Sequence, residues 1–307
     1  MNSRYDVIIT GGGPAGLTAG LYTARGRLKT LLIEKMLIGG QITMAELVEN
    51  FPGFPDGVSG LDLTDMMHKQ ATKYGLETLM AQVTGIELRD RDKIVKTDSG
   101  DFTARAVIIA SGAERSKLNV PGEAEFTGRG VSFCATCDGA FFRDKTVAVV
   151  GGGNVAVSEA LYLSRLANKV IIIHRRDQLR ASRILQESIL NDPKIELKWD
   201  SVMESIQGDT LVRHLNIRQV KTGKLTEVPV DGVFIAVGFK PETGYLKNIV
   251  ALDETGHIIT DETMKTNVPG IFAAGDIRHN SGRQVITAAG DGAMAAMSAE
   301  RYLADHQ

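Results

Sequence analysis

The sequence predicts an α/β protein with two Rossmann-like dinucleotide-binding domains, each built on a βαβ core with antiparallel β-meander additions. Three observations support this prediction. A glycine-rich G-x-G-x-x-G/A pattern occurs twice, at residues 11–16 and 151–156. Each copy follows a short apolar, strand-like run and precedes a helix-like segment, which is the order of a βαβ unit. The chain has 307 residues, and about 150 residues per domain is the usual expectation.

The first βαβ unit contains the parts that dinucleotide binding needs. They are a strand-like run at 5–10, the loop at 11–16, a helix-like segment at 17–25, a second strand-like run at 30–33, and Glu34 at its end. Gly11 and Gly13 allow a tight turn and close approach to a pyrophosphate, and Gly16 allows close packing of helix on strand. The helix N-terminus offers N–H groups to phosphates, and Glu34 suits a ribose 2′-hydroxyl. The alternative is a glycine-rich turn that binds nothing.

The second unit repeats this order. Its parts are a strand-like run at 145–150, the loop at 151–156, a helix-like segment at 159–163 and a strand-like run at 170–173. The strand end equivalent to Glu34 is His174, which is followed by Arg175, Arg176 and, one turn further, Arg180.

The two strand ends predict different nucleotides. The carboxylate of Glu34 would repel a 2′-phosphate, whereas guanidinium groups bind phosphate through paired hydrogen bonds. We therefore expect a non-phosphorylated dinucleotide in the first site and NADP(H) in the second. The alternative is that the three arginines, with Arg183, form a solvated basic helix face.

Later strand-like segments predict how the two domains are connected. Three of them end in glycine or just beyond it, at 106–112, 233–238 and 270–276. The third has no counterpart in the second unit, so the chain after about residue 245 is expected to return to the first domain. We predict a discontinuous first domain, residues 1–115 and 246–307, and an inserted second domain, residues 116–245. Alternating stretches at 86–97 and 211–228 predict the antiparallel additions.

Composition excludes several classes of function. Lys+Arg number 35 against Asp+Glu 37, a net charge of −2, so we expect no nucleic-acid partner and no anionic membrane partner. No apolar run reaches 18 residues and the N-terminus lacks a leader pattern, which favours a soluble, cytoplasmic protein. The six histidines are scattered. We therefore expect no metal site.

The two cysteines, Cys134 and Cys137, are three residues apart. One pair supplies only half of the ligands of a four-cysteine zinc site. The pair can instead close a small, reducible disulfide ring, and a helix N-terminus would favour a thiolate. Asp138 is adjacent and could supply or remove a proton. One alternative is that the two cysteines are inert buried thiols. A separate alternative is that Asp138 is only a helix cap.

Taken together, these motifs resemble the bacterial-type (low-molecular-weight) thioredoxin reductases, class II of the FAD/NAD(P)-dependent pyridine nucleotide-disulfide oxidoreductases. The resemblance runs from residue 5 to residue 303. Its carriers are GGGPAG at 11–16, GGQ at 39–41, VENFPGF at 48–54, CATCDGAFF at 134–142, GGGNVAV at 151–157, HRRDQLRAS at 174–182, VPGIFAAGD at 268–276 and RQVITAAGDGAMAA at 283–296.

The resemblance implies an NADPH-dependent thioredoxin-disulfide reductase with FAD in the first site, NADPH in the second, thioredoxin as the protein substrate, and a homodimer. It implies that Cys134 attacks the disulfide of thioredoxin, that Cys137 faces the flavin, and that Asp138 protonates the departing thiolate. The other functions considered are a related flavin disulfide reductase with ferredoxin as donor, or with a peroxiredoxin or small-molecule dithiol as acceptor, and a nucleotide-sensing flavoprotein without catalytic activity.

The cofactor-binding residues follow from the resemblance by position. For FAD they are Gly11, Gly13, Pro14, Ala15, Gly16, Glu34, Lys35, Gly40, Gln41, Asn50, Val83, Ser111, Gly112, Gly275, Asp276, Gln284, Val285 and Ile286. For NADPH they are Gly151, Gly153, Asn154, Val155, Glu159, His174, Arg175, Arg176, Arg180 and Gly238. The family usually has Ser or Thr at position 155 and an acid at 158, where this chain has Val155 and Ser158. Loss of a phosphate hydrogen bond predicts NADPH binding that is weakened by about 1 kcal/mol, and not abolished.

Overall fold

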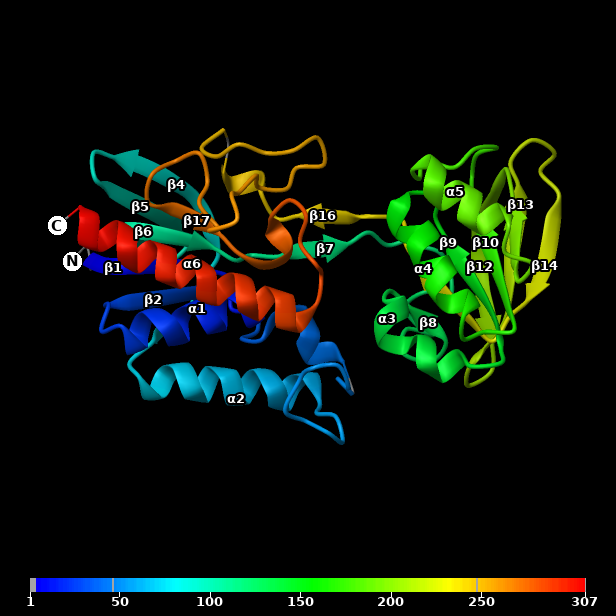
Figure 1. The fold of residues 1–307 in the computed structure, drawn as a ribbon, viewed down its shortest axis with the longest axis horizontal. Coiled ribbons are helices and arrows are strands. Elements are labelled where there is room, and N and C mark those ends of the chain that lie inside the picture. The colour runs from blue at the N-terminus through cyan, green and yellow to red at the C-terminus, as the bar shows by residue number, and fades with distance from the viewer. Residues whose placement is uncertain (1–3, 46, 247, 307) are drawn as a thin grey trace. The chain divides into compact units, whose positions relative to one another are not determined.

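A computed structural model describes residues 4–45, 47–246 and 248–306 (Figure 1). The chain forms two compact units, Met1–Glu114 with Lys240–Gln307, and Arg115–Phe239. The first unit is therefore discontinuous, with the second inserted into it. The chain passes between the units through two short strands, β7 (Ala113–Arg115) and β16 (Phe239–Pro241), which pair with each other.

The second crossing lies at Phe239, before the expected boundary at residue 245. Tyr245 shows why, because its hydroxyl lies 3.1 Å from Oγ1 of Thr10 and 3.0 Å from Oγ of Ser111. Both partners belong to the first unit. A tyrosine can bury its ring in a core only where its hydroxyl finds hydrogen-bonding partners, and these two hydroxyls tie the chain to the first unit from residue 245 onward.

The first unit is built on a seven-stranded sheet of order β3-β2-β1-β6-β5-β4, with β17 also pairing with β6. The strands are β1 (Arg4–Thr10), β2 (Thr30–Glu34), β3 (Glu77–Met80), β4 (Val83–Arg89), β5 (Asp92–Thr97), β6 (Gly100–Ile109) and β17 (Ile271–Ala273). Pairings among β1, β2, β3, β6 and β17 are parallel, and β4-β5-β6 is an antiparallel meander. The long strand β6 belongs to both parts.

Alternate residues of β1 face two different core layers, as the strand period requires. Val7 and Ile9 pack with helices α1 (Pro14–Arg25) and α6 (Val285–Asp305), and α2 (Gly60–Lys73) also contributes to this layer. Ile8 packs with residues of the segment 245–277 on the other face. Short 3₁₀ turns, η1 (Gly40–Met44), η3 (Gly244–Leu246) and η4 (Gly275–Ile277), complete the unit.

The second unit repeats the parallel core on a smaller scale. Its sheet has the order β11-β10-β9-β15-β8, and a separate three-stranded sheet has the order β12-β13-β14. The parallel strands are β8 (Val131–Ser132), β9 (Thr146–Val150), β10 (Lys169–Ile173), β11 (Ile195–Lys198) and β15 (Gly232–Ile235). The antiparallel strands are β12 (Ser201–Gly208), β13 (Val212–Gln219) and β14 (Leu225–Pro229), and the helices are α3 (Ala135–Asp138), η2 (Gly139–Phe142), α4 (Asn154–Ser164) and α5 (Arg183–Leu190).

The predicted fold class is confirmed. Both βαβ cores are present, and the stretches expected to be antiparallel form the pairs β4-β5 and β13-β14. Within the described part of the chain, no helix combines the length and apolar character needed to span a membrane.

Candidate active site

The first glycine loop has the backbone geometry of a pyrophosphate cradle. Gly11 has φ +106°, and a Cβ there would lie 2.3 Å from the carbonyl oxygen of Ala110. A Cβ on Gly16 would lie 1.9 Å from the carbonyl oxygen of Gly11. At Gly13, by contrast, the nearest atom to an added Cβ is 4.0 Å away, and no side chain caps the helix that follows. The loop is therefore closely packed at Gly11 and Gly16, and it leaves space beside Gly13. A phosphate in that space would meet the first turn of α1.

Glu34 is held beside this loop by backbone donors. Its Oε2 accepts a hydrogen bond from the N–H of Gly12 at 2.7 Å, and its Oε1 accepts from the N–H of Met36 at 3.0 Å. An ionised carboxylate has about four acceptor positions, so a ribose hydroxyl could still donate to it. The neighbouring Lys35 instead lies 3.8 Å from a carboxylate oxygen of Glu114 and 3.6 Å from one of Glu242.

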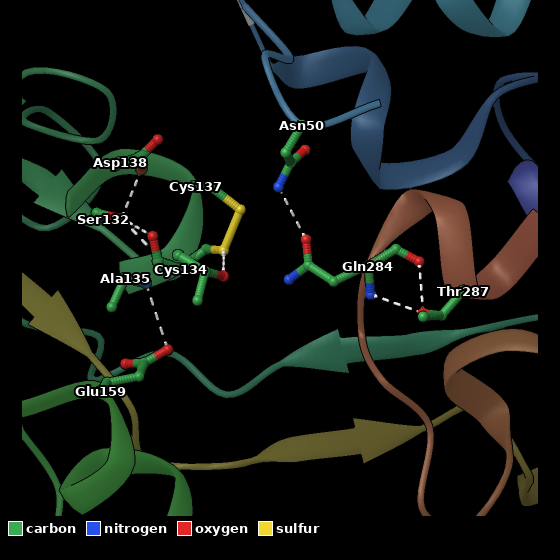
Figure 2. The surroundings of a disulfide bond; sticks show 10 residues. Asn50, Ser132, Cys134, Ala135, Cys137, Asp138, Glu159, Gln284 and Thr287 are labelled. Carbon is green, nitrogen blue, oxygen red and sulfur yellow. Dashed lines mark hydrogen bonds between the residues drawn. A yellow bond between two sulfur atoms is a disulfide. The ribbon is translucent and has the colours of Figure 1, made fainter. Parts of the chain in front are cut away.

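The other expected FAD residues also lie in the first unit, around the same ends of its parallel strands. Asn50 Nδ2 donates to Gln284 Oε1 at 3.1 Å, although the two residues are 234 positions apart. Gln284 also begins α6 through a capping box with Thr287 (Figure 2). The side chain of Gln41 donates to the carbonyl of Ala113 at 2.6 Å.

Further expected positions are turns and helix starts. Gly40, Gly112 and Gly275 all have positive φ. Pro14 and Ala15 begin α1, and Val285 and Ile286 begin α6. Val83 begins strand β4. Asp276 accepts from the hydroxyl of Ser281 at 2.7 Å. Ser111 follows β6 and is hydrogen-bonded to Tyr245, so this network fixes the turn that leads to Gly112.

A partly buried ion pair that the sequence did not reveal supports the turn at Gly275. Arg278 donates from Nε to Asp291 Oδ2 at 2.5 Å and from Nη2 to Oδ1 at 2.9 Å. Asp291 Oδ2 also accepts from the N–H of Gly275 at 3.1 Å. Asp291 thereby ties α6 to the residue before Asp276. The signal available in the sequence was that Asp291 is an acid within the alanine-rich run 288–299.

The second glycine loop matches the first in construction. A Cβ on Gly151 would lie 2.5 Å from the carbonyl oxygen of Ala236, whereas Gly153 has nothing within 4 Å. No side chain caps α4. In both loops the first glycine donates its N–H to the end of the second strand, Gly11 to Ile33 at 2.8 Å and Gly151 to Ile173 at 3.1 Å. Gly238 follows β15 with φ +125°.

His174 lies against this second loop and is buried, at 5% exposed. A Cβ on Gly152 would meet its ring at 2.3 Å. Its Nε2 lies 3.0 Å from the carbonyl oxygen of Gln178 and must therefore carry the hydrogen. Burial lowers the pKa of His174, and the nearby charges of three arginines lower it further. His174 thus supports the loop as a neutral ring.

Those arginines, Arg175, Arg176 and Arg180, are exposed at the end of β10. Among the described residues no ion pair involves their side chains. Their positive charges help to lower the pKa of His174, whose ring packs against Gly152 of the loop. Such a cluster can bind a phosphate monoester by charge-assisted hydrogen bonds.

The first turn of α4 contains two more of the expected NADPH residues. Asn154 Oδ1 accepts from the N–H of Ser182 at 2.8 Å, which joins the loop to the start of α5. Val155 is 41% exposed and offers no hydroxyl. Glu159 Oε1 lies 3.5 Å from the N–H of Ala135, so this side chain also contacts the helix that carries the cysteines.

Cys134 and Cys137 form a disulfide within the second unit (Figure 2). Cys134 is the N-cap of α3, and Cys137 is exposed on that helix. Asp138 Oδ2 accepts from the hydroxyl of Ser132 at 2.5 Å. Ser132 was not expected from the sequence. Across the described ranges, no group of three or more histidine, cysteine or acidic side chains is placed to hold a metal ion.

Known proteins are similar to this chain in both sequence and fold. A family model described as pyridine nucleotide-disulphide oxidoreductase matches residues 5–292. The thioredoxin reductase of Treponema pallidum is 47% identical over 303 residues, which cover 99% of this chain and 98% of that protein. The thioredoxin reductase of Bacillus subtilis is 46% identical over 304 residues, covering 99% and 96%. The crystal structure of thioredoxin reductase from Streptococcus pyogenes matches with a TM-score of 0.92 and 46% identity, covering 99% and 100% of the two chains.

Proposed function

Because the chain belongs to the pyridine nucleotide-disulphide oxidoreductase family, we propose that it is a thioredoxin reductase, a flavoprotein that uses NADPH to reduce the disulfide of thioredoxin. The observation that carries this proposal is the Cys134–Cys137 disulfide on α3, with Asp138 on the same helix. A reducible dithiol pair beside a nucleotide-binding core is what thiol–disulfide exchange requires.

FAD and NADPH are the two cofactors, and the residues of the two units fit them. The first unit combines a loop open above Gly13 with the fixed carboxylate of Glu34, which suits the unphosphorylated ribose of FAD. The second unit combines a loop open above Gly153 with exposed Arg175 and Arg176, which suits the 2′-phosphate of NADPH. When bound, NADPH and FAD together supply two electrons to the disulfide.

The remaining chemistry belongs to the chain's own side chains. Uptake of two electrons and two protons breaks the disulfide and leaves a Cys134 thiolate, a Cys137 thiol and a protonated Asp138. The thiolate attacks one sulfur of the thioredoxin disulfide, and the departing sulfur takes the proton of Asp138. Asp138 then accepts the Cys137 proton as Cys137 attacks Cys134, and returns that proton to the second thioredoxin sulfur. The internal disulfide is restored and thioredoxin leaves as a dithiol.

The assembly and location of the protein are also proposals. We assign FAD to residues 1–114 with 240–307, and NADPH with the active disulfide to residues 115–239. A homodimer is supported by the exposed apolar side chains of Tyr22, Met294 and Met297 on α1 and α6. Light scattering on the purified flavoprotein would test it. A cytoplasmic location suits a disulfide that must be reduced in each cycle.

An anaerobic titration tests the electron donor directly. We expect two equivalents of NADPH, one for the disulfide and one for the flavin, to bleach the flavin absorbance, and NADH to do so only at a much higher concentration. Strong bleaching by NADH with little effect of NADPH would contradict the assignment of the arginines.

A further inference from the structure

Through its side chain, Ser132 contacts both ends of the short segment 134–138 that contains the disulfide. It is the last residue of β8, it is buried at 5% exposed, and it pairs with Phe234 of the neighbouring strand. Its Oγ lies 2.5 Å from Asp138 Oδ2, 3.1 Å from the backbone nitrogen of Cys134 and 3.4 Å from the carbonyl oxygen of Cys134 (Figure 2).

Counting hydrogens settles the direction of these bonds. A serine hydroxyl has one proton, an ionised carboxylate can only accept, and a backbone N–H can only donate. The hydroxyl therefore donates to Asp138 Oδ2, the shorter and charge-assisted bond, and accepts from the N–H of Cys134. The contact of 3.4 Å with the carbonyl oxygen of Cys134 would need the hydroxyl proton that is already donated to Asp138. One hydroxyl thus links the backbone of the attacking cysteine to the carboxylate of the proton donor.

We infer that Ser132 is a positioning residue for the thiol–disulfide step. By occupying Oδ2, it directs any proton that Asp138 takes up to Oδ1, the oxygen that does not face the serine. It also holds Asp138 at a fixed distance from the N-cap at Cys134. This inference rests on the proposed function, because Asp138 needs a transferable proton only if the cysteines reduce a disulfide.

A double-mutant cycle tests the inference on the full-length, FAD-loaded protein with NADPH and thioredoxin. We expect Ser132→Ala to lower kcat about tenfold, the effect of about 1.4 kcal/mol, with the KM for thioredoxin unchanged. The rate at which NADPH bleaches the flavin should not change. When Asp138→Asn is already present, adding Ser132→Ala should change kcat less than about twofold, because Ser132 acts through Asp138.

Two further variants separate positioning from folding. Ser132→Thr keeps the hydroxyl and should recover most of the lost kcat. Ser201→Ala is the matched control, since Ser201 is a buried serine of the same unit, 6% exposed, whose hydroxyl donates to the carbonyl of Trp199. It should leave kcat unchanged. The fluorescence of Trp199, the chain's one tryptophan, reports whether this unit is folded in each variant.

The outcomes are distinct. Equal losses of kcat from Ser132→Ala with and without Asp138→Asn would overturn the role of Ser132, as would slowed flavin bleaching or a threonine variant as slow as the alanine one. A wild-type protein whose flavin is bleached by NADPH but which leaves thioredoxin oxidised would overturn the proposed function itself.

Discussion

Replacing Asp291 with alanine is expected to destabilise the first unit by about 3–5 kcal/mol. Asp291 accepts three hydrogen bonds, two from Arg278 and one from the N–H of Gly275. The side chains of this ion pair are only 17% and 10% exposed. Alanine would leave the partly buried guanidinium of Arg278 without a counter-charge, and it would release the turn that precedes Asp276. We therefore also expect weaker FAD binding.

Removing both charges should cost less than removing one. In Arg278→Met with Asp291→Leu no buried charge remains, and only the N–H of Gly275 loses its acceptor, which costs about 1–3 kcal/mol. The matched control is Asp305→Ala, an exposed acid at the end of the same helix, whose effect should stay within about 0.5 kcal/mol.

Urea unfolding with two probes measures these effects. The rise in flavin fluorescence on release of FAD reports the first unit, and the emission of Trp199 reports the second. Asp291→Ala should move only the flavin transition to lower urea. An unchanged flavin transition, or a double variant that costs as much as the sum of the two single changes, would refute the account of this ion pair.

Three further predictions concern the second unit. The double variant Arg175→Ala with Arg176→Ala should raise the KM for NADPH at least tenfold, because each charge-assisted bond contributes about 1.5–3 kcal/mol. The KM for NADH should not change. Equal increases in the KM for NADPH and for NADH would contradict recognition of the 2′-phosphate. Val155→Thr should lower the Kd for NADPH about fivefold by adding about 1 kcal/mol of hydrogen bonding, measured by calorimetry, and an unchanged Kd would remove Val155 from the binding site. Because burial lowers the pKa of His174, the unfolded chain, with an ordinary histidine pKa of about 6.5, binds more protons in mild acid. The free energy of unfolding of this unit should therefore fall as pH drops below about 6.5. In urea titrations of Trp199 fluorescence at pH 5.5 and 7.5, His174→Gln should reduce this dependence of stability on pH. An unchanged dependence would contradict a neutral His174 ring.

The nucleotide loops were predictable because their signal is local. Gly11 and Gly151 each stand within a short run that contains the strand, the turn and the start of the helix, so the backbone geometry follows from neighbouring residues. The order of glycine and acid also located Glu34. The disulfide pair was predictable for the same reason, since Cys134 and Cys137 are separated by two residues.

The supporting contacts were not predictable because they join residues that the sequence separates. Tyr245 reaches Thr10 across 235 positions, so residue 245 already belongs to the first unit, and the crossing lies before it, after Phe239. The bond from Gly275 to Asp291 spans 16 positions. Asp291 stands out as an acid in an alanine-rich run, but no neighbouring residue identifies Gly275 or Arg278 as its partner. Such contacts depend on how the elements pack in three dimensions.

His174 shows a subtler limit. Its position at the strand end was found by counting from the first glycine, as for Glu34. Its burial against Gly152 depends on ring packing, which the count does not reveal. The same holds for Ser132, whose place on an edge strand beneath Asp138 becomes visible only when β8 and α3 are seen together.

In the proposed reaction, Cys134 and Cys137 carry electrons from NADPH to thioredoxin. The most direct measurement is NADPH oxidation in the presence of oxidised thioredoxin, by the wild-type protein and by Cys134→Ser and Cys137→Ser. We predict one thioredoxin dithiol for each NADPH oxidised by the wild type. Each serine variant should lose this turnover while its flavin is still bleached by NADPH. Thioredoxin reduction that survives either substitution would contradict the account.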